Sequence, residues 1–347
     1  MKTEFDDLLG CINLFDEIYK TKKDLQNVFF DLQILQEKKF EVSLGIAISN
    51  IRDEMLSKID ILEVAMEKTN EVANTTIFLQ KIKLNPLYSY KKVKSYYFQH
   101  YSIPVEIKDY LNKSKNIVDN IIKEISKIDD SKIIDIIFDN TVDAYNLGGN
   151  LGLKIFDIPI EFKMLSEGTK KYLKTNANDL AGNFAKQLST GVRYEIYEGI
   201  KNNETIKDIR NRIINVWDNV IEVRVPPKVI NEEIVSSGYT YRIDNNVWIT
   251  TVARTETTEA FTNGKLESFS QIGVVDYVEY VTAEDEATCD ECLGMGGMVY
   301  PLEQSFGVIP IHGRCRCSFI PLLANGMDYN TAKDLALENI YEIYEIG

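Results

Sequence analysis

The stretch that decides the fold of the C-terminal part reads TCDECLGMGG over residues 288–297 and IHGRCRC over residues 311–317. It gathers four of the five cysteines and one of the two histidines of the chain into 29 residues. Thiolates and imidazoles at such short spacings are the donors with which proteins hold zinc in a tetrahedron. The sequence therefore predicts one structural Zn²⁺ per chain, with five candidate ligands: Cys289, Cys292, His312, Cys315 and Cys317.

Five donors compete for four places in a closed site. Cys289 and Cys292 form the firmer pair, because a CxxC turn offers two thiolates from one knuckle. Cys315 and Cys317 could supply both remaining ligands and leave His312 outside the first shell, or His312 could bind together with one of them. A cluster of reduced thiols in a small core is the alternative without metal. A redox CxxC is disfavoured because no βαβ unit is visible around it.

No catalytic residue is predicted. A metalloprotease needs HExxH, and a cytidine deaminase needs HxE followed by PCxxC; neither pattern occurs. The histidine outside the cluster is His100. A zinc-dependent hydrolase or toxin-like effector, and a DNA-binding zinc module, are the alternative functions of the cluster.

Short strands and helices are expected on both sides of the cluster. DYVEYVTA (276–283) is rich in β-branched and aromatic residues and predicts a strand. Further short strands are expected near 298–300 and 318–322, and a final helix over 330–344. Before them, residues 239–248 predict two strands joined by a turn at Asp244–Asn246, followed by a helix over about 250–271 that leads to Gly273.

The first 70 residues predict long amphipathic helices. Apolar residues recur at helical spacing, with Gly45 as the expected break between two helices: Phe15, Ile18, Leu25, Val28, Leu32, Leu35, Ile48, Ile51, Met55, Leu62 and Met66. A helical hairpin with an ordinary core is one interpretation, and a coiled-coil arm that grips a partner is the other.

The middle of the chain is again helical in pattern. Helix is expected over 105–145, with a break at Asp129–Ser131, and over 160–221. The glycine cluster Gly148, Gly149 and Gly152 is interpreted as a helix stop and turn, because its spacing does not fit a nucleotide-binding loop.

The predicted fold class is mainly α (α+β), a helical body with long amphipathic helices and a small C-terminal β-containing, zinc-knuckle-like module. The expected segments are a helical hairpin or arm over 1–80, a Lys/Tyr-rich linker over 81–104, a helical body over 105–272, a Cys/His metal-binding module over 273–325 and a C-terminal helix over 326–347.

The linker is unusual in charge. No Asp or Glu occurs between Val72 and Val105, and lysines alternate with aromatic residues. Such a stretch can hold a phosphate backbone and stack bases, anchor a protein interface, or pack on the bundle as a plain linker. DNA contact would run through Lys81, Lys83, Lys91, Lys92 and Lys94.

Composition restricts the partners and the compartment. The chain has 347 residues, with 39 Lys and Arg against 53 Asp and Glu, and a net charge of -14. Nucleic-acid binding would have to be local, because phosphate contact needs a surplus of basic residues. No apolar run long enough for a membrane anchor is present, and acids occupy the N-terminus where a signal peptide needs an apolar core. We therefore expect a reducing, cytosol-like compartment, with cysteines present as thiols or ligands.

Three segments together resemble a known family. They are ARTETTEAFTNGKLESFSQIG (253–273), YVTAEDEATCDECLGMGG (280–297) and IPIHGRCRC (309–317). The series is similar to the phage Mu F-like minor head protein family, in which a helix with an ARTE-like start precedes a D-x-x-T-C-x-x-C turn and an H-P-x-C-R-C segment. Here Gly313 stands where the family usually has Pro. The resemblance covers about residues 140–322.

The resemblance implies a minor capsid, or head morphogenesis, protein of a tailed bacteriophage or prophage. Such a protein associates with the portal protein and with the major capsid or scaffold protein, and assists head assembly or DNA packaging and ejection. Its place would be the capsid interior at the portal vertex, after a passage through the host cytoplasm. Arg254 and Glu256 of the ARTE start are expected to be structural, each with a partner elsewhere, because side chains two apart on a helix do not face each other.

Overall fold

The computed structural model describes residues 22–75, 119–120, 122–124, 126–164, 166–202, 204–219, 221–225, 228–230, 233–236, 239–283, 288–323 and 327–344. The helices are α2 (Lys22–Thr75), α6 (Ser131–Ile155), α7 (Glu167–Lys201), α8 (Ile206–Asn219), α9 (Asn245–Ile272), α10 (Asp290–Met295), α11 (Leu302–Ser305) and α12 (Tyr329–Ile343). The strands are β1 (Ile221–Val225), β2 (Lys228–Ile230), β3 (Glu233–Ser236), β4 (Tyr239–Ile243), β5 (Val275–Val281), β6 (Val299–Pro301) and β7 (Ser318–Leu323).

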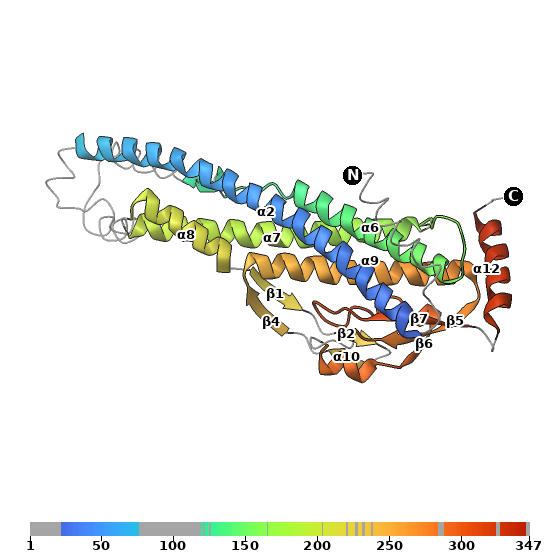
Figure 1. The fold of residues 1–347 in the computed structure, drawn as a ribbon. Helices are drawn as coiled ribbons and strands as arrows, with labels where there is room; N and C mark the ends of the chain where they lie inside the picture. The colour runs from blue at the N-terminus through green and yellow to red at the C-terminus, as the bar shows by residue number, and fades with distance from the viewer. Residues whose placement is uncertain are drawn as a thin grey trace.

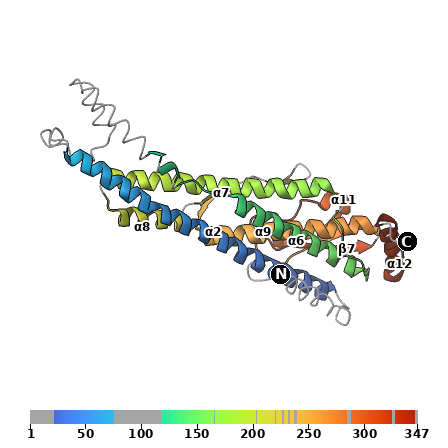
Figure 2. The ribbon, with the colours of Figure 1, turned by 90° about the horizontal axis from the view of Figure 1, so that it is seen from above.

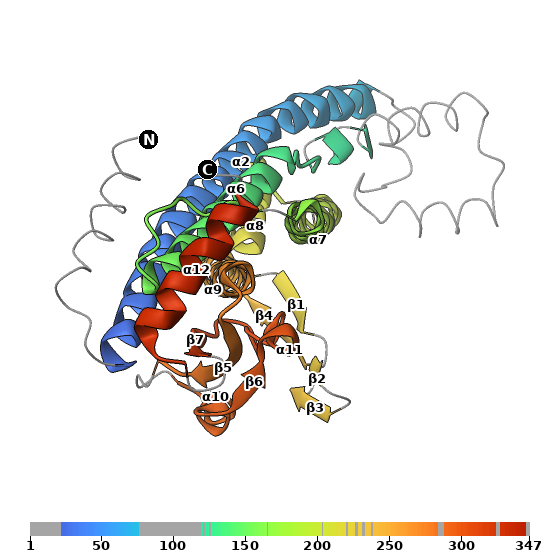
Figure 3. The same ribbon diagram turned by 90° about the vertical axis from the view of Figure 1, so that its right-hand side faces the viewer.

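Long helices form one layer, and a small β-containing module lies against one side of it (Figure 1). The view from above shows α2 crossing α6 and α9 obliquely (Figure 2). Viewed from the end, the strands β5, β6 and β7 lie beneath α9 (Figure 3). The predicted α+β class, with a helical body and a small C-terminal sheet beside the Cys/His cluster, is confirmed. Within the described residues, no helix has the length and apolar character that crossing a membrane requires.

The module contains a three-stranded antiparallel sheet in the order β6-β5-β7. All three strands fall where the sequence predicts them. Asp244 is different, because it does not sit in a turn between strands. It caps the N-terminus of α9 by accepting a hydrogen bond from the amide of Val247 at 2.8 Å, so the predicted second strand is wrong and α9 begins at Asn245.

α6 and α9 are in backbone contact, and glycine makes this possible. A Cβ atom added at Gly148 would overlap the carbonyl oxygen of Phe261, and one added at Gly264 would overlap the carbonyl oxygen of Tyr145. The interpretation of the 148–152 cluster as a helix stop is therefore wrong. All three glycines lie inside α6: Gly148 and Gly152 face α9, and Gly149 lies against the ring of Phe162, so none of these positions has room for a side chain.

α2 runs through Gly45 without a break, so the predicted helix boundary there is wrong. A single glycine costs a helix about 1 kcal/mol relative to alanine, and buried apolar residues on both sides offset that cost. Those residues are Phe40, Leu44, Ile48, Ile51, Met55 and Ile59. Of the hairpin predicted over residues 1–80, the structure describes this one helix of 54 residues, about 80 Å long. The Lys/Tyr-rich stretch 81–104 lies outside the described residues.

The buried face of α2 is partly polar. Leu32, Ile48, Ile51 and Met55 of the predicted stripe are buried, but Leu35 is 45% exposed. Gln33, Gln36 and Glu37 are buried in its place. The apolar pattern misplaces this part of the face because α2 packs here on polar groups of α6 and α9, to which Gln33 and Gln36 donate hydrogen bonds.

One prediction concerns the two kinds of glycine. Gly264→Ala should destabilise the fold by about 1–3 kcal/mol or more, because a methyl group cannot fit against the backbone of α6. Gly45→Ala is the matched control. No atom lies within 4 Å of a Cβ added there, and the change should raise stability by about 0.5–1 kcal/mol. Denaturant unfolding of both variants measures the difference; equal effects of the two substitutions would contradict the close contact.

Candidate metal centre

The first half of the centre is a turn that opens the short helix α10. Cys289 sits at its N-cap in extended conformation, and the amide of Cys292 donates to Cys289 Sγ at 3.4 Å. An N-cap acceptor is usually an oxygen; here the sulfur fills that place. This turn brings both sulfurs of the CxxC pair to one side, as the sequence predicts.

His312 enters from the loop between α11 and β7. Its Nε2 lies 3.0 Å from Cys289 Sγ and 3.2 Å from Cys292 Sγ. Its Nδ1 lies 2.8 Å from the carbonyl oxygen of Gly313, an arrangement in which Nδ1 donates and Nε2 keeps its lone pair for a metal. The contact with the backbone carbonyl orients the imidazole toward the cluster, although residue 313 is Gly and not the Pro that is usual in the resembling family.

Cys315 and Cys317 complete the cluster. Cys315 Sγ lies 3.8 Å from Cys292 Sγ and accepts a hydrogen bond from the amide of Cys317 at 3.5 Å. Both cysteines are buried. The donor atoms form two overlapping groups, Cys289–Cys292–His312 and Cys292–Cys315–Cys317, each with its atoms within 4.8 Å of one another. All five predicted donors are therefore brought together, with Cys292 common to both groups.

The donor set fits zinc. In a tetrahedron with Zn–S near 2.3 Å, two sulfurs lie about 3.8 Å apart, and a sulfur and a nitrogen about 3.5 Å. The separation of Cys292 and Cys315 meets the first value, and the imidazole needs to move only a few tenths of an ångström to meet the second. Thiolate and imidazole ligands favour zinc over the oxygen-seeking cations.

The thiols polarise one another. Hydrogen bonding from the thiols of Cys292 and Cys317 holds the pKa of Cys315 well below its ordinary value. The pKa of Cys292 is raised, chiefly because its proton is donated to Cys315. Metal ligation needs deprotonated sulfur. The lowered pKa of Cys315 acts in the direction that ligation requires.

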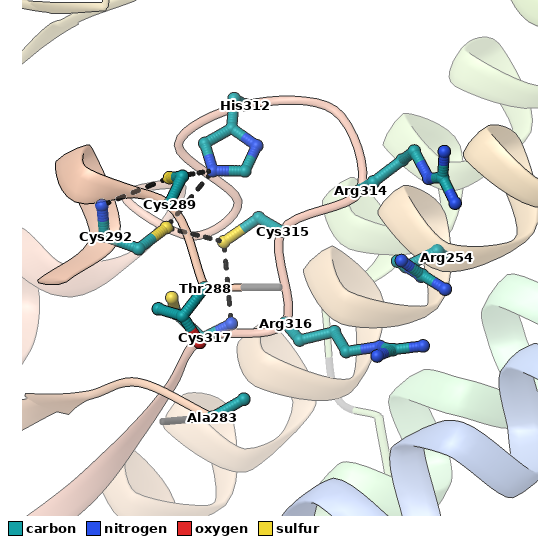
Figure 4. Close-up of a pocket in the computed structure, with 10 residues that line it drawn as sticks. All are labelled: Arg254, Ala283, Thr288, Cys289, Cys292, His312, Arg314, Cys315, Arg316 and Cys317. Atoms are coloured by element: carbon teal, nitrogen blue, oxygen red, sulfur yellow. Dashed lines mark hydrogen bonds between the residues drawn. The ribbon is translucent and has the colours of Figure 1, made fainter. Parts of the chain in front are cut away.

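Three arginines share the small cavity at this cluster, which has a volume of about 30 Å³ (Figure 4). Arg254 comes from α9, and Arg314 and Arg316 alternate with the cysteines of the loop. The close-up shows the guanidinium groups together on the side away from the sulfurs. Arg314 has a positive φ of 68°, and its amide donates to Thr255 Oγ1 at 2.9 Å, which fixes the loop against α9.

Arg254 and Glu256 each find a partner on another helix, as expected. Arg254 Nε lies 2.6 Å from Glu37 Oε1, and Glu256 accepts a hydrogen bond from Asn176. Glu37 is a residue that sequence reasoning missed. Glu37 belongs to no sequence motif. The one signal in the sequence is that a charged residue falls on the inner face of an amphipathic helix.

A second prediction concerns metal content. Protein purified without chelator should hold one zinc per chain, and because structural zinc contributes about 10–16 kcal/mol in small zinc domains, chelation should lower the melting temperature of the module. Cys292→Ser should lose the metal entirely, because Cys292 belongs to both donor groups. His312→Ala should lose as much if its nitrogen is a ligand. Elemental analysis measures both; metal-free wild-type protein in its reduced form would exclude the site.

A third prediction concerns pH. Burial raises the pKa of the Glu256 carboxyl to about 8, with a smaller contribution from the charge of Glu259. The folded state then binds a proton that the unfolded chain, with a glutamate pKa near 4.3, releases. Stability contributed by this group is complete at low pH and is lost as the pH rises toward 8, with a slope of at most about 1.4 kcal/mol per pH unit.

Glu256→Gln should flatten this part of the stability profile, because the amide keeps the shape and cannot ionise. Exposed Glu303→Gln makes the same substitution at a solvent-exposed carboxyl and serves as the control. Urea unfolding from pH 5 to 9 gives the profile. An unchanged slope in Glu256→Gln would show that the carboxyl is already ionised in the folded state.

Comparison with known proteins adds one finding. No curated protein and no solved structure matches the chain. A family does match over residues 186–320, which include all of α9, most of the three-stranded sheet and all five donors, while α2 and α6 lie outside the matched segment. This C-terminal part of the chain is thus similar to the family described as Phage Mu protein F like protein.

Proposed function

We propose that this chain is a minor capsid, or head morphogenesis, protein of a tailed bacteriophage or prophage. The observation that carries the proposal is the family match across residues 186–320. That segment holds the Cys/His cluster and the two arginines that contact Glu37. The match therefore covers both the candidate metal ligands and the residues that hold their loop. The proposed place of action is the virion, at the inner face of the capsid near the portal.

The proposed partners are the portal protein and the major capsid or scaffold protein. A long helix of 54 residues, exposed along part of its length, suits a protein that reaches between subunits of a large assembly. Leu35, Val42 and Ile46 are exposed apolar residues of this helix, spaced seven and four apart, and so share one face. The lysines of the 81–104 stretch are proposed as a further contact, with portal, capsid wall or packaged DNA.

The role proposed for the metal is structural. Four protein ligands close a zinc ion to substrate, and the cluster offers five. The metal would fasten the α10 turn to the loop that precedes β7, which the three-stranded sheet and α9 support. We propose no turnover for this protein. An open zinc position is the property that would favour the hydrolase instead.

Co-purification from procapsids tests the assembly role. Wild-type protein should copurify with portal in a few copies per head. Replacing Lys91, Lys92 and Lys94 by Glu reverses the charge of the proposed contact and should therefore lower that copy number. The stability of the protein should not change. Replacing the exposed residues Lys132, Lys170 and Lys171 by Glu makes the same change of charge on α6 and α7 and is the control.

The salt dependence of binding distinguishes a contact with DNA phosphate from a contact with a protein partner. Binding to phosphate should weaken linearly on a log–log plot as salt rises, because counterions are released. An aromatic protein contact should respond far less. Absence of wild-type protein from purified procapsids and virions would reject the proposed function; a normal copy number in the lysine variant would reject only the proposed contact.

A further inference from the structure

Glu37 of α2 pairs with two arginines, Arg254 of α9 and Arg316 of the metal module. Its Oε1 lies 2.6 Å from Arg254 Nε and its Oε2 lies 3.5 Å from Arg316 Nε. The Glu37 side chain is only 5% exposed. Arg316 stands between Cys315 and Cys317 in the sequence, so this ion pair reaches within one residue of two candidate ligands.

A second link runs from the same face of α2, one turn earlier. Gln33 Nε2 donates to Thr258 Oγ1 on α9, and that hydroxyl donates to the carbonyl oxygen of Cys315 at 2.8 Å. Gln33 and Thr258 are both buried. Two separate routes therefore connect α2 to the backbone segment that carries Cys315 and Cys317.

The chemistry of a buried carboxylate makes these links matter. A carboxylate withdrawn from water is stable only when charge and hydrogen bonds replace its hydration. Arg316 can pair with Glu37 only while the 315–317 segment keeps its present course. In an extended segment, successive side chains alternate in direction, so an arginine held toward α2 leaves the neighbouring sulfurs directed toward the metal side. Figure 4 shows this division, with Arg316 reaching toward the helices and the Cys315 sulfur toward Cys292.

We propose that α2 is part of the outer shell of the metal centre, with Glu37 as its positioning residue, and that metal binding and docking of α2 stabilise each other. This inference rests on the proposed structural metal and extends it. The matched segment, residues 186–320, does not include α2. The proposed metal site is therefore supported by a helix that lies outside the matched segment. Coupling between two sites is reciprocal, so each event strengthens the other by the same factor.

The first test measures Zn²⁺ affinity of the full chain by competition with a chromophoric chelator, and records the Co²⁺ absorption spectrum. Loss of an outer-shell partner typically lowers metal affinity about 10–100-fold, and we expect a decrease in that range for Glu37→Gln. Glu41→Gln is the matched control. It makes the same substitution one turn along α2, where the carboxylate accepts from Thr250 Oγ1 at 2.6 Å and does not contact the loop. Its affinity and Co²⁺ spectrum should equal those of the wild type.

A double-mutant cycle assigns the effect to the ion pair. Arg316→Gln should lower affinity as well, and the double variant Glu37→Gln/Arg316→Gln should be weakened by clearly less than the product of the two single effects. Fully multiplicative effects would show that Glu37 does not act through Arg316. Equal affinities for Glu37→Gln, Glu41→Gln and wild type would overturn the proposal while leaving the metal site itself intact.

The reverse direction needs no substitution. Hydrogen exchange of the wild-type chain, with zinc and after chelation, should show faster exchange over residues 29–41 of α2 when the metal is removed. The helix α7 over 173–188, which does not contact the loop, should be unaffected. Unchanged exchange in α2 would overturn the coupling. A wild-type chain that binds no zinc would overturn both this inference and the structural metal on which it rests.

Discussion

The contact between the backbones of α6 and α9 is the constraint on which the rest of the structure depends. Gly148 and Gly264 remove the side chains that would hold the helices apart. With α6 so close, α9 is covered on that side and presents its remaining sides to α2, to the sheet and to α12. One buried cluster accordingly joins residues of α6, α9, the sheet, the metal loop and α12.

α9 is a buried helix that also carries polar side chains, and these contact the loop of the candidate metal centre. Thr255 and Thr258 hold the loop backbone, and Arg254 meets Glu37. Farther along, Lys265 is fully buried. It donates to Ser318 Oγ at 2.5 Å and its Nζ lies 3.7 Å from the centre of the Phe29 ring. Burial lowers the pKa of Lys265 well below its ordinary value. These four polar side chains orient the elements around α9, because each has a partner on another element.

The sequence predicts the local turns and strands of the chain, but not the contacts between helices that lie far apart in the sequence. The CxxC turn and the strands β5, β6 and β7 follow from spacing and residue type, and the helix break at Asp129–Ser131 from its turn residues. At Gly45 and Gly148 the predicted end of a helix is wrong. Both are glycines within helical patterns, where the residue type alone predicts a break. One is only tolerated, and the other is required by a neighbouring helix that lies more than a hundred residues away in the sequence.

Glu37 and Leu35 show the same limit on the N-terminal helix. Apolar periodicity predicts that Leu35 is buried, but the groups that face residues 33–37 are Thr258, Arg254 and the carbonyl oxygen of Asn140, so glutamine and glutamate face inward. A helical pattern describes one helix alone and contains no information about the chemistry of the surface on which it packs. The Cys/His cluster was predictable because its members are close in sequence and have few other roles together.

X-ray absorption at the zinc edge of the purified 347-residue chain tests the central claim most directly. A closed structural site predicts four protein ligands, three or four of them sulfur near 2.3 Å, and no bound water. An imidazole contribution would place His312 among the four. A site with three protein ligands and an exchangeable water would contradict the account, because the metal would then be open to substrate.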